Sequence, residues 1–243
     1  MVPKSFKYPT ILLLIFLAAC KDAPKATPAA PIKSTVTDSI NEAENTDEGQ
    51  EPIQEKEEEP FVLTEENAID FFFKYQKDLP KTRVKITTNF GSFVIELYDN
   101  VPYHKANFVY LTKQGYFNNT MFHRVVKGFI IQGGNADNIA TAKKRREIGK
   151  YLLPPDTRKG YKHHRGTISM PSSELDNPHM LASPYEFFIV VTKPGSYHLD
   201  GSYTPFGRVI QGMDVVDLIS IQPVDDGDWP SQNILIEKAE IVD

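Results

Sequence analysis

The spacing of apolar residues changes along the chain, and each change marks an expected element. Between Thr64 and Pro80, apolar side chains recur three and four positions apart, which is typical of an amphipathic helix. We expect Thr64 to cap this helix and Pro80 to end it, with Ile69, Phe72 and Phe73 on one face. The helix is short, so we expect it to pack onto the barrel predicted below rather than to form a separate domain.

From Lys81 onward, apolar and polar positions alternate, which is the period of a half-buried strand. Residues 84–86 and 93–98 alternate on either side of an Asn-Phe-Gly-Ser turn at 89–92, and this arrangement predicts a hairpin. Further strand-like runs cover residues 120–126, 129–133, 167–170, 187–191, 206–210 and 234–242.

Two core helices are expected among these strands. One begins at Pro102 and ends before Gly115, and the other covers residues 213–219. Many short strands with two core helices predict a mainly β fold. We expect a closed eight-stranded antiparallel barrel over residues 81–243, capped by two helices, with an extra N-terminal helix at 61–80.

The first twenty residues have the pattern of an export signal. Lys4 and Lys7 precede an uninterrupted apolar run at residues 11–19, which is too short to span a bilayer as a helix. The run ends in Leu-Ala-Ala-Cys at 17–20, which resembles the bacterial lipobox, whose cysteine is acylated and becomes the mature N-terminus. We therefore expect a signal peptide over 1–20 and lipidation at Cys20. The alternative is a plain signal peptide in which Cys20 is incidental.

Composition separates residues 21–60 from the folded part. This stretch is rich in Pro and Ala and then in Asp and Glu, so it has little to bury and predicts a disordered tether. Of the 32 acidic and 27 basic residues, 11 and 6 lie in residues 1–60, which leaves 21 of each in 61–243. A neutral domain lacks the basic surface of a nucleic-acid binder. We interpret the basic run at 143–150 as a solvated loop face.

The most specific motif is FHRVVKGFIIQGG at residues 122–134. It closely resembles the signature of the cyclophilin peptidyl-prolyl isomerases. Further segments match that family in order, namely residues 107–108, 115–117, 166–170, 186–189, 199–201, 206–209 and 212–213. The resemblance covers about residues 82–243. It implies an enzyme that isomerises X–Pro bonds and needs neither a cofactor nor a metal.

The chemistry of that reaction fits the residues of the motif. The X–Pro amide resists rotation because resonance gives its C–N bond double-bond character, with a barrier of ~18–20 kcal/mol. A hydrogen-bond donor at the prolyl nitrogen weakens that resonance, and Arg124 carries five donors on an always-protonated group. The resemblance makes Arg124 the catalytic residue. It also implies an apolar pocket for the proline ring, and it implies that Gln132 holds the substrate backbone and steadies Arg124. The implied substrate-contact residues are Phe122, Phe129, Ile130, Gln132, Ser172, Glu186, Phe188, His198, Leu199 and Tyr203.

Several positions depart from the family pattern. Glu186 stands where many members have Gln, and a carboxylate accepts hydrogen bonds without donating. His198 stands where cyclosporin-sensitive members carry Trp, and Tyr203 stands where eukaryotic members have His. Residues 135–165 are expected to form a long loop. We interpret His163 and His164 in that loop, and His179 after it, as solvent-exposed side chains and not as metal ligands.

The leading hypothesis is an isomerase for X–Pro segments of exported proteins. It would be a monomer, anchored to a membrane of the cell envelope through Cys20, with its domain outside the cytoplasm and no nucleic-acid partner. The alternative is a chaperone module that holds Pro-containing segments with little turnover. A purely structural envelope lipoprotein is a third reading, but it would not require this set of pocket residues.

Overall fold

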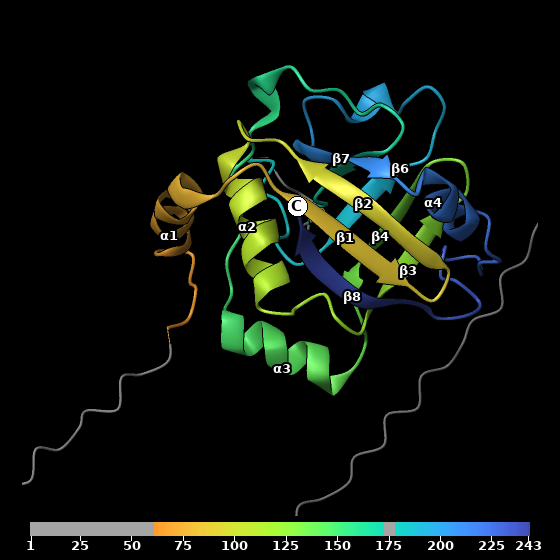
Figure 1. Cartoon of the computed structure of the whole chain (residues 1–243), viewed down its shortest axis with the longest axis horizontal. Coiled ribbons are helices and arrows are strands. Elements are labelled where there is room, and N and C mark those ends of the chain that lie inside the picture. Colours follow the sequence, from red (N-terminus) through yellow and green to blue (C-terminus); the bar gives the residue numbers. More distant parts are fainter. Residues whose placement is uncertain (1–60, 173–177) are drawn as a thin grey trace, which may run out of the picture. The chain divides into compact units, whose positions relative to one another are not determined.

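The computed structural model describes residues 61–172 and 178–243. Figure 1 shows a barrel of strands in this part of the chain, with α1 and α2 on one side of it and α4 on the other. The signal peptide predicted at 1–20, the lipidation predicted at Cys20 and the tether predicted at 21–60 lie outside the described residues.

Eight strands form the barrel, in the order β1-β2-β7-β5-β6-β4-β3-β8, and β8 pairs with β1 to close it. Every neighbouring pair is antiparallel. The fold class predicted from the sequence is therefore confirmed. The strands are β1 (Arg83–Thr88), β2 (Gly91–Leu97), β3 (Thr120–Val126), β4 (Ile130–Asn135), β5 (Thr167–Ser169), β6 (Phe187–Val190), β7 (Pro205–Gln211) and β8 (Ile234–Val242).

The barrel interior is filled by aromatic and branched side chains. Val84 and Ile86 are fully buried because alternate residues of β1 point inward. The ring of Phe122 lies 6.3 Å from that of Phe93 and 5.7 Å, edge-on, from that of Phe187. Such rings bury large apolar areas and dominate the stability of a small core.

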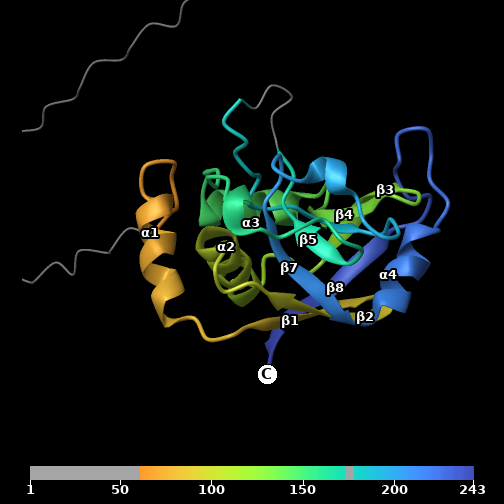
Figure 2. The same ribbon diagram turned by 90° about the horizontal axis from the view of Figure 1, so that it is seen from above.

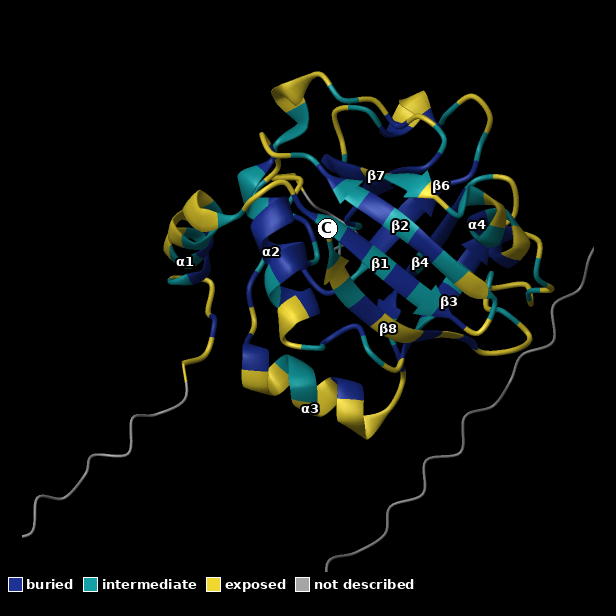
Figure 3. Cartoon of the chain, viewed as in Figure 1, coloured by how far each residue is buried: buried dark blue, intermediate teal, exposed yellow. Residues whose placement is uncertain are grey.

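Two helices close the barrel, as predicted. Helix α2 (Pro102–Lys113) begins with Pro at its first turn, and Gly115 follows its C-cap with a φ of 63°, which glycine adopts without steric cost. Figure 3 shows α2 as largely buried, because it lies between the barrel and α1. Helix α4 (Met213–Ser220) packs through Val216 and Ile219.

The extra N-terminal helix is present, although it differs in detail from the prediction. Helix α1 (Ala68–Tyr75) continues as the 3₁₀ turn η1 (Gln76–Asp78), and its N-cap is Asn67, not Thr64. The two residues exchange hydrogen bonds of 2.8 and 3.3 Å, so Thr64 sits one turn before the helix. Phe73 is exposed, and Phe71 packs inward instead.

Helix α1 packs on α2 and not directly on the strands. Figures 1 and 2 both place it on the side of α2 that faces away from the barrel. The contact is aromatic, since the ring of Tyr110 on α2 meets the rings of Phe71, Phe72 and Tyr75 at 5.2 to 6.0 Å. As expected, the helix belongs to the same compact unit as the barrel, but it packs there through α2, because α2 already covers that end.

The predicted long loop at 135–165 contains helix α3 (Ile139–Ile148). Asn138 caps the start of this helix, because its side chain accepts from the Thr141 N–H. Gly149, with a φ of 130°, ends the helix. Leu63 is bound beside this end, because its N–H donates to the Ile148 carbonyl at 2.8 Å and its carbonyl accepts from Lys150 at 3.0 Å. Across both described ranges, no helix is long and apolar enough to cross a bilayer.

Helix α2 carries a histidine in the core. His104 has no exposed surface, and neither ring nitrogen has a hydrogen-bond partner among the described residues. Burial lowers the pKa of His104 to about 3. The folded state therefore keeps this ring neutral at pH values where the unfolded chain, with its ordinary pKa, takes up a proton.

We predict that His104 makes the protein sensitive to mild acid. Its folded pKa lies below the unfolded value, so stability is lost as pH falls below about 6.5, on the order of 2 kcal/mol by pH 5. His104→Leu should remove this part of the loss, while the part due to buried His163 remains. Urea unfolding of residues 61–243 at pH 7.5 and pH 5 measures it. His179→Leu, at an exposed histidine, is the control. An equal loss in His104→Leu and the unmodified protein would contradict the prediction.

Candidate active site

A second apolar cluster lies on the outer face of the barrel, apart from the main core. Successive residues of a strand point to opposite faces, so Phe187 and Ile189 of β6 enter the main core, whereas Phe188 and Val190 point outward. All four are buried because both faces of β6 are covered. The outer cluster comprises Ile130, Phe188, Val190 and Leu199, with Val126, Phe129 and Tyr203 packed against it.

This cluster borders a hollow of about 220 Å³. Eight of its nine lining residues are ones that the resemblance implied, and Pro171 is the ninth. They come from β3, the turn before β4, β4, β6, residues 171–172 and the segment around the 3₁₀ turn η3 (Tyr197–Leu199). The lining comprises Arg124, Phe129, Ile130, Gln132, Pro171, Ser172, Phe188, Leu199 and Tyr203.

A register shift in β3 brings Arg124 to this hollow. Phe122 points into the barrel, and with regular alternation Arg124, two residues on, would point inward as well. The pairing with β4 shifts between Phe122 and Arg124, and His123 is the extra residue. Arg124 therefore shares the outer face with its cross-strand partner Gln132.

Arg124 and Gln132 each bind a different carboxylate. The Nη2 of Arg124 donates to Oδ2 of Asp228 at 3.0 Å, and 43% of the Arg124 side chain is exposed. The Nε2 of Gln132 donates to Oε2 of Glu186 at 2.8 Å. Among the described residues, the guanidinium of Arg124 therefore binds Asp228, and no hydrogen bond joins it to Gln132, so the expectation that Gln132 steadies Arg124 stays a prediction.

Glu186 is the centre of a polar network behind the hollow. Besides Gln132, its carboxylate accepts from Asn135 at 3.2 Å and lies 3.5 Å from His123 and 3.7 Å from Arg145. Burial alone would raise the pKa of Glu186, but the contacts with His123, Gln132 and Arg145 outweigh burial and lower it. A charged carboxylate can only accept hydrogen bonds, so Glu186 binds the nitrogen end of the Gln132 side-chain amide. The amide oxygen of Gln132 then points away from Glu186 and can accept from another donor.

His163 was expected to be solvent-exposed and is instead fully buried. Burial lowers its pKa more than the neighbouring Asp200 raises it, so the ring is neutral. Its Nδ1 lies 2.8 Å from Asp200 and its Nε2 lies 3.0 Å from the Ser169 hydroxyl. The ring stacks 6.2 Å behind Phe188 and supports that wall of the hollow. His164 and His179 are exposed, as expected.

Three of the implied substrate contacts do not line the hollow. Phe122 has no exposed surface and belongs to the barrel core. Glu186 acts through Gln132, as described above. His198 is exposed and stacks on Phe129 with ring centroids 5.2 Å apart, so it borders the hollow from outside.

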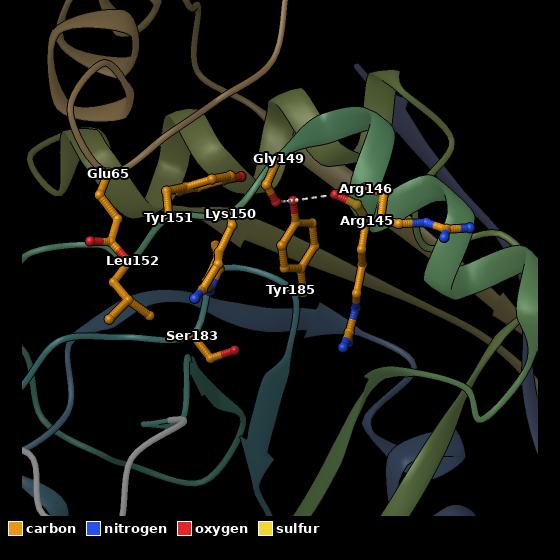
Figure 4. A pocket seen from close by; sticks show the side chains of 10 residues that line it. Glu65, Arg145, Arg146, Gly149, Lys150, Tyr151, Leu152, Ser183 and Tyr185 are labelled. Carbon is orange, nitrogen blue, oxygen red and sulfur yellow. Dashed lines mark hydrogen bonds between the residues drawn. The ribbon is translucent and has the colours of Figure 1, made fainter. Parts of the chain in front are cut away.

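Helix α3 borders a larger hollow of about 380 Å³, which Figure 4 shows. The Tyr185 hydroxyl donates to the Gly149 carbonyl, and the Arg145 guanidinium lies 5.2 Å from the Tyr185 ring. Lys144 donates to three backbone carbonyls. The interpretation of 143–150 as a solvated loop face was thus wrong for Lys144 and Arg145, which bind structural groups.

The hollow at Arg124 combines an apolar seat with a cationic donor at its edge. This combination can hold a small apolar ring while the guanidinium donates to a polar atom attached to it. Within residues 61–172 and 178–243, no three His, Cys, Asp or Glu side chains are grouped to hold a metal ion.

Comparison with known proteins agrees with this geometry. The family model described as cyclophilin type peptidyl-prolyl cis-trans isomerase/CLD matches residues 83–241. Peptidyl-prolyl cis-trans isomerase-like 3 of Dictyostelium discoideum is 37% identical over 160 residues, 65% of this chain and 94% of that protein. Peptidyl-prolyl cis-trans isomerase-like 2 of Rhizopus delemar is 37% identical over 171 residues, 70% of this chain but only 30% of that longer protein.

Solved structures agree as well. The crystal structure of a cyclophilin type peptidyl-prolyl cis-trans isomerase from Cryptosporidium parvum matches with a TM-score of 0.57 and 29% identity, covering 68% of this chain and 99% of that one. The same protein in the presence of the dipeptide Ala-Pro matches with a TM-score of 0.55 and 30% identity, covering 66% and 99%.

The closed barrel and its arginine-edged hollow define an isomerase of the cyclophilin class. The chain belongs to the cyclophilin-type peptidyl-prolyl cis-trans isomerase family.

We predict that this protein binds cyclosporin weakly, because His198 replaces the Trp that the resemblance assigns to sensitive members. His198→Trp would add apolar area beside Phe129 and should tighten binding by ~2 kcal/mol, about thirtyfold in Kd. Turnover should be nearly unchanged, since His198 does not line the hollow. Titration calorimetry measures the affinity, and His179→Trp controls for an added surface ring. Nanomolar binding by the unmodified protein would contradict the prediction.

Proposed function

We propose that the protein isomerises X–Pro bonds by non-covalent catalysis, with Arg124 as donor to the prolyl nitrogen. The observation that carries this proposal is the position of Arg124 at the edge of the apolar hollow. Its guanidinium has five donors and only one bond to Asp228 among the described residues, so donors remain for the substrate. A lone pair engaged by that donor no longer delocalises into the carbonyl, and the C–N bond rotates more easily.

The proline ring would sit against Phe129, Ile130, Phe188 and Leu199. Ile130, Phe188 and Leu199 are nearly buried, which indicates a pre-formed apolar seat. The Tyr203 ring meets Phe188 edge-on at 5.5 Å and closes one side. A solved relative was crystallised in the presence of the dipeptide Ala-Pro, which supports a Pro-containing ligand for this fold.

Gln132 and Ser172 would hold the substrate backbone. Because Glu186 accepts from the Gln132 amide nitrogen, the Gln132 oxygen is left to accept a substrate N–H. The Glu that departs from the family pattern thus orients Gln132 and does not need to contact the substrate itself. Ser172 lines the same hollow and brings a hydroxyl to its side.

The proposed substrates are X–Pro segments of exported proteins. The support comes from the sequence, where residues 1–19 have the pattern of an export signal and precede a cysteine in a lipobox-like setting. On this proposal, the domain works as a monomer outside the cytoplasm, attached to the membrane through Cys20.

We predict that Arg124→Ala lowers kcat/KM for X–Pro isomerisation at least about 100-fold, or ~3 kcal/mol. A protease-coupled assay on residues 61–243 measures it. Stability should change little, because the side chain is partly exposed and its ion pair is near the surface. Arg208→Ala removes an exposed arginine outside the hollow and should retain activity. A folded Arg124→Ala protein with full turnover would refute the mechanism, whereas a protein that binds Pro peptides without turnover would favour the chaperone alternative.

We also predict that the full-length protein partitions with the membranes of a bacterial host. Cys20→Ser should remove the acylated thiol and shift the protein to the soluble fraction, because no other cysteine is present in the sequence. Fractionation followed by immunoblotting measures the shift, and Ser5→Ala in the same signal region is the control. Unchanged membrane retention of Cys20→Ser would rule out the lipid anchor.

A further inference from the structure

The loop between α4 and β8 reaches across to β3 beside Arg124. The Val125 N–H donates to the carbonyl of Asp228 at 2.8 Å, and an isolated pairing of Val224 with Pro230 draws the two sides of the loop together. Val125 is the residue after Arg124 on β3. The loop is therefore tied to the backbone directly beside the guanidinium.

The turn at the tip of this loop is fixed by its own hydrogen bonds. The carboxylate of Asp225 accepts from the N–H groups of Gly227 and Trp229, both at 2.9 Å. Asp228 has a φ of 65°, in the left-handed region that Asp and Asn tolerate better than most residues. Non-glycine residues held there are over-represented at functional sites, so the outlier calls for a functional explanation.

The result of this geometry is one directed contact. The Asp228 carboxylate accepts from Nη2 of Arg124 at 3.0 Å, and the two side chains are 35% and 43% exposed. In the part of the chain that the structure describes, no other acidic side chain pairs with Arg124. The Asp228 contact therefore holds the guanidinium end of a long, partly exposed side chain.

We infer that Asp228 is a positioning residue for the isomerisation reaction. Its carboxylate engages Nη2 of Arg124, which lines the hollow, and leaves the other N–H groups of the guanidinium available for a substrate. This inference rests on the proposed role of Arg124 as the donor to the prolyl nitrogen. A preorganised donor lowers the barrier because less reorganisation is needed when the amide rotates.

A positioning role differs measurably from a structural one. Exposed ion pairs contribute little to folding stability, so loss of this pair should leave the unfolding midpoint nearly unchanged. The apolar seat is untouched, so KM should also change little. The loss should appear in kcat, because the guanidinium is correctly placed in fewer of the bound complexes.

The test compares Asp228→Asn with Asp226→Asn in residues 61–243. Asn keeps the shape of the side chain and tolerates the left-handed backbone, while the control removes the same charge from an exposed neighbour in the same loop. We expect kcat for X–Pro isomerisation to fall roughly 5- to 30-fold in Asp228→Asn, with KM within about twofold. Asp226→Asn should have unchanged kinetics, and Asp228→Glu should restore part of the activity.

Two further measurements separate this inference from the proposed function. In an Arg124→Ala background, Asp228→Asn should cause no additional loss, because the group that it positions is gone. Relaxation of the Arg124 Nε–H group by NMR should show greater mobility in Asp228→Asn than in the unmodified protein. Full turnover of Arg124→Ala would overturn the proposed mechanism itself.

The inference about Asp228 alone would be overturned by other results. If Arg124→Ala is inactive while Asp228→Asn keeps its kcat, Arg124 is catalytic without help from this carboxylate. If kcat rises in Asp228→Asn, the carboxylate restrains the guanidinium from the substrate. If the unfolding midpoint falls while kcat of the folded fraction is unchanged, the ion pair is purely structural.

Discussion

The register of β3 in a closed barrel is the constraint on which the candidate site depends. Each strand has a partner on both sides, so the face that a side chain occupies is set by its register and cannot relax at a free edge. The single extra residue at His123 reverses the alternation between Phe122 and Arg124. Phe122 can therefore fill the core while Arg124, only two positions later, reaches the outer hollow.

Carboxylates from distant parts of the chain hold the polar groups around that hollow. Asp228 binds Arg124, Glu186 binds Gln132, and Asp200 binds His163. Burial opposes ionisation of Glu186 and Asp200, but their hydrogen bonds prevail and the pKa of each is lowered. At neutral pH both are charged acceptors, which leaves their partners in defined orientations.

The strands and most of the hollow could be predicted because both have strong local signals. Alternation marked the strands. One contiguous motif supplied four lining residues of the hollow, namely Arg124, Phe129, Ile130 and Gln132. Helix α3 was missed because its exposed, charged sequence has no apolar period, although Asn138 and Gly149 mark its ends. Two contacts could not be predicted, because each joins residues that are far apart in the sequence. Buried His163 contacts Asp200, 37 positions away, and Arg124 contacts Asp228, 104 positions away.

The way in which Leu63 is bound has a mechanical consequence. Its side chain is fully buried, and two backbone hydrogen bonds join it to the end of α3. A side chain on Gly149 would collide with the Leu63 carbonyl, so glycine is required for this close seat. A force pulling on the chain N-terminal to Leu63 would act first on these two hydrogen bonds and on the end of α3. The strands that carry the hollow would stay unstrained until Leu63 is pulled free.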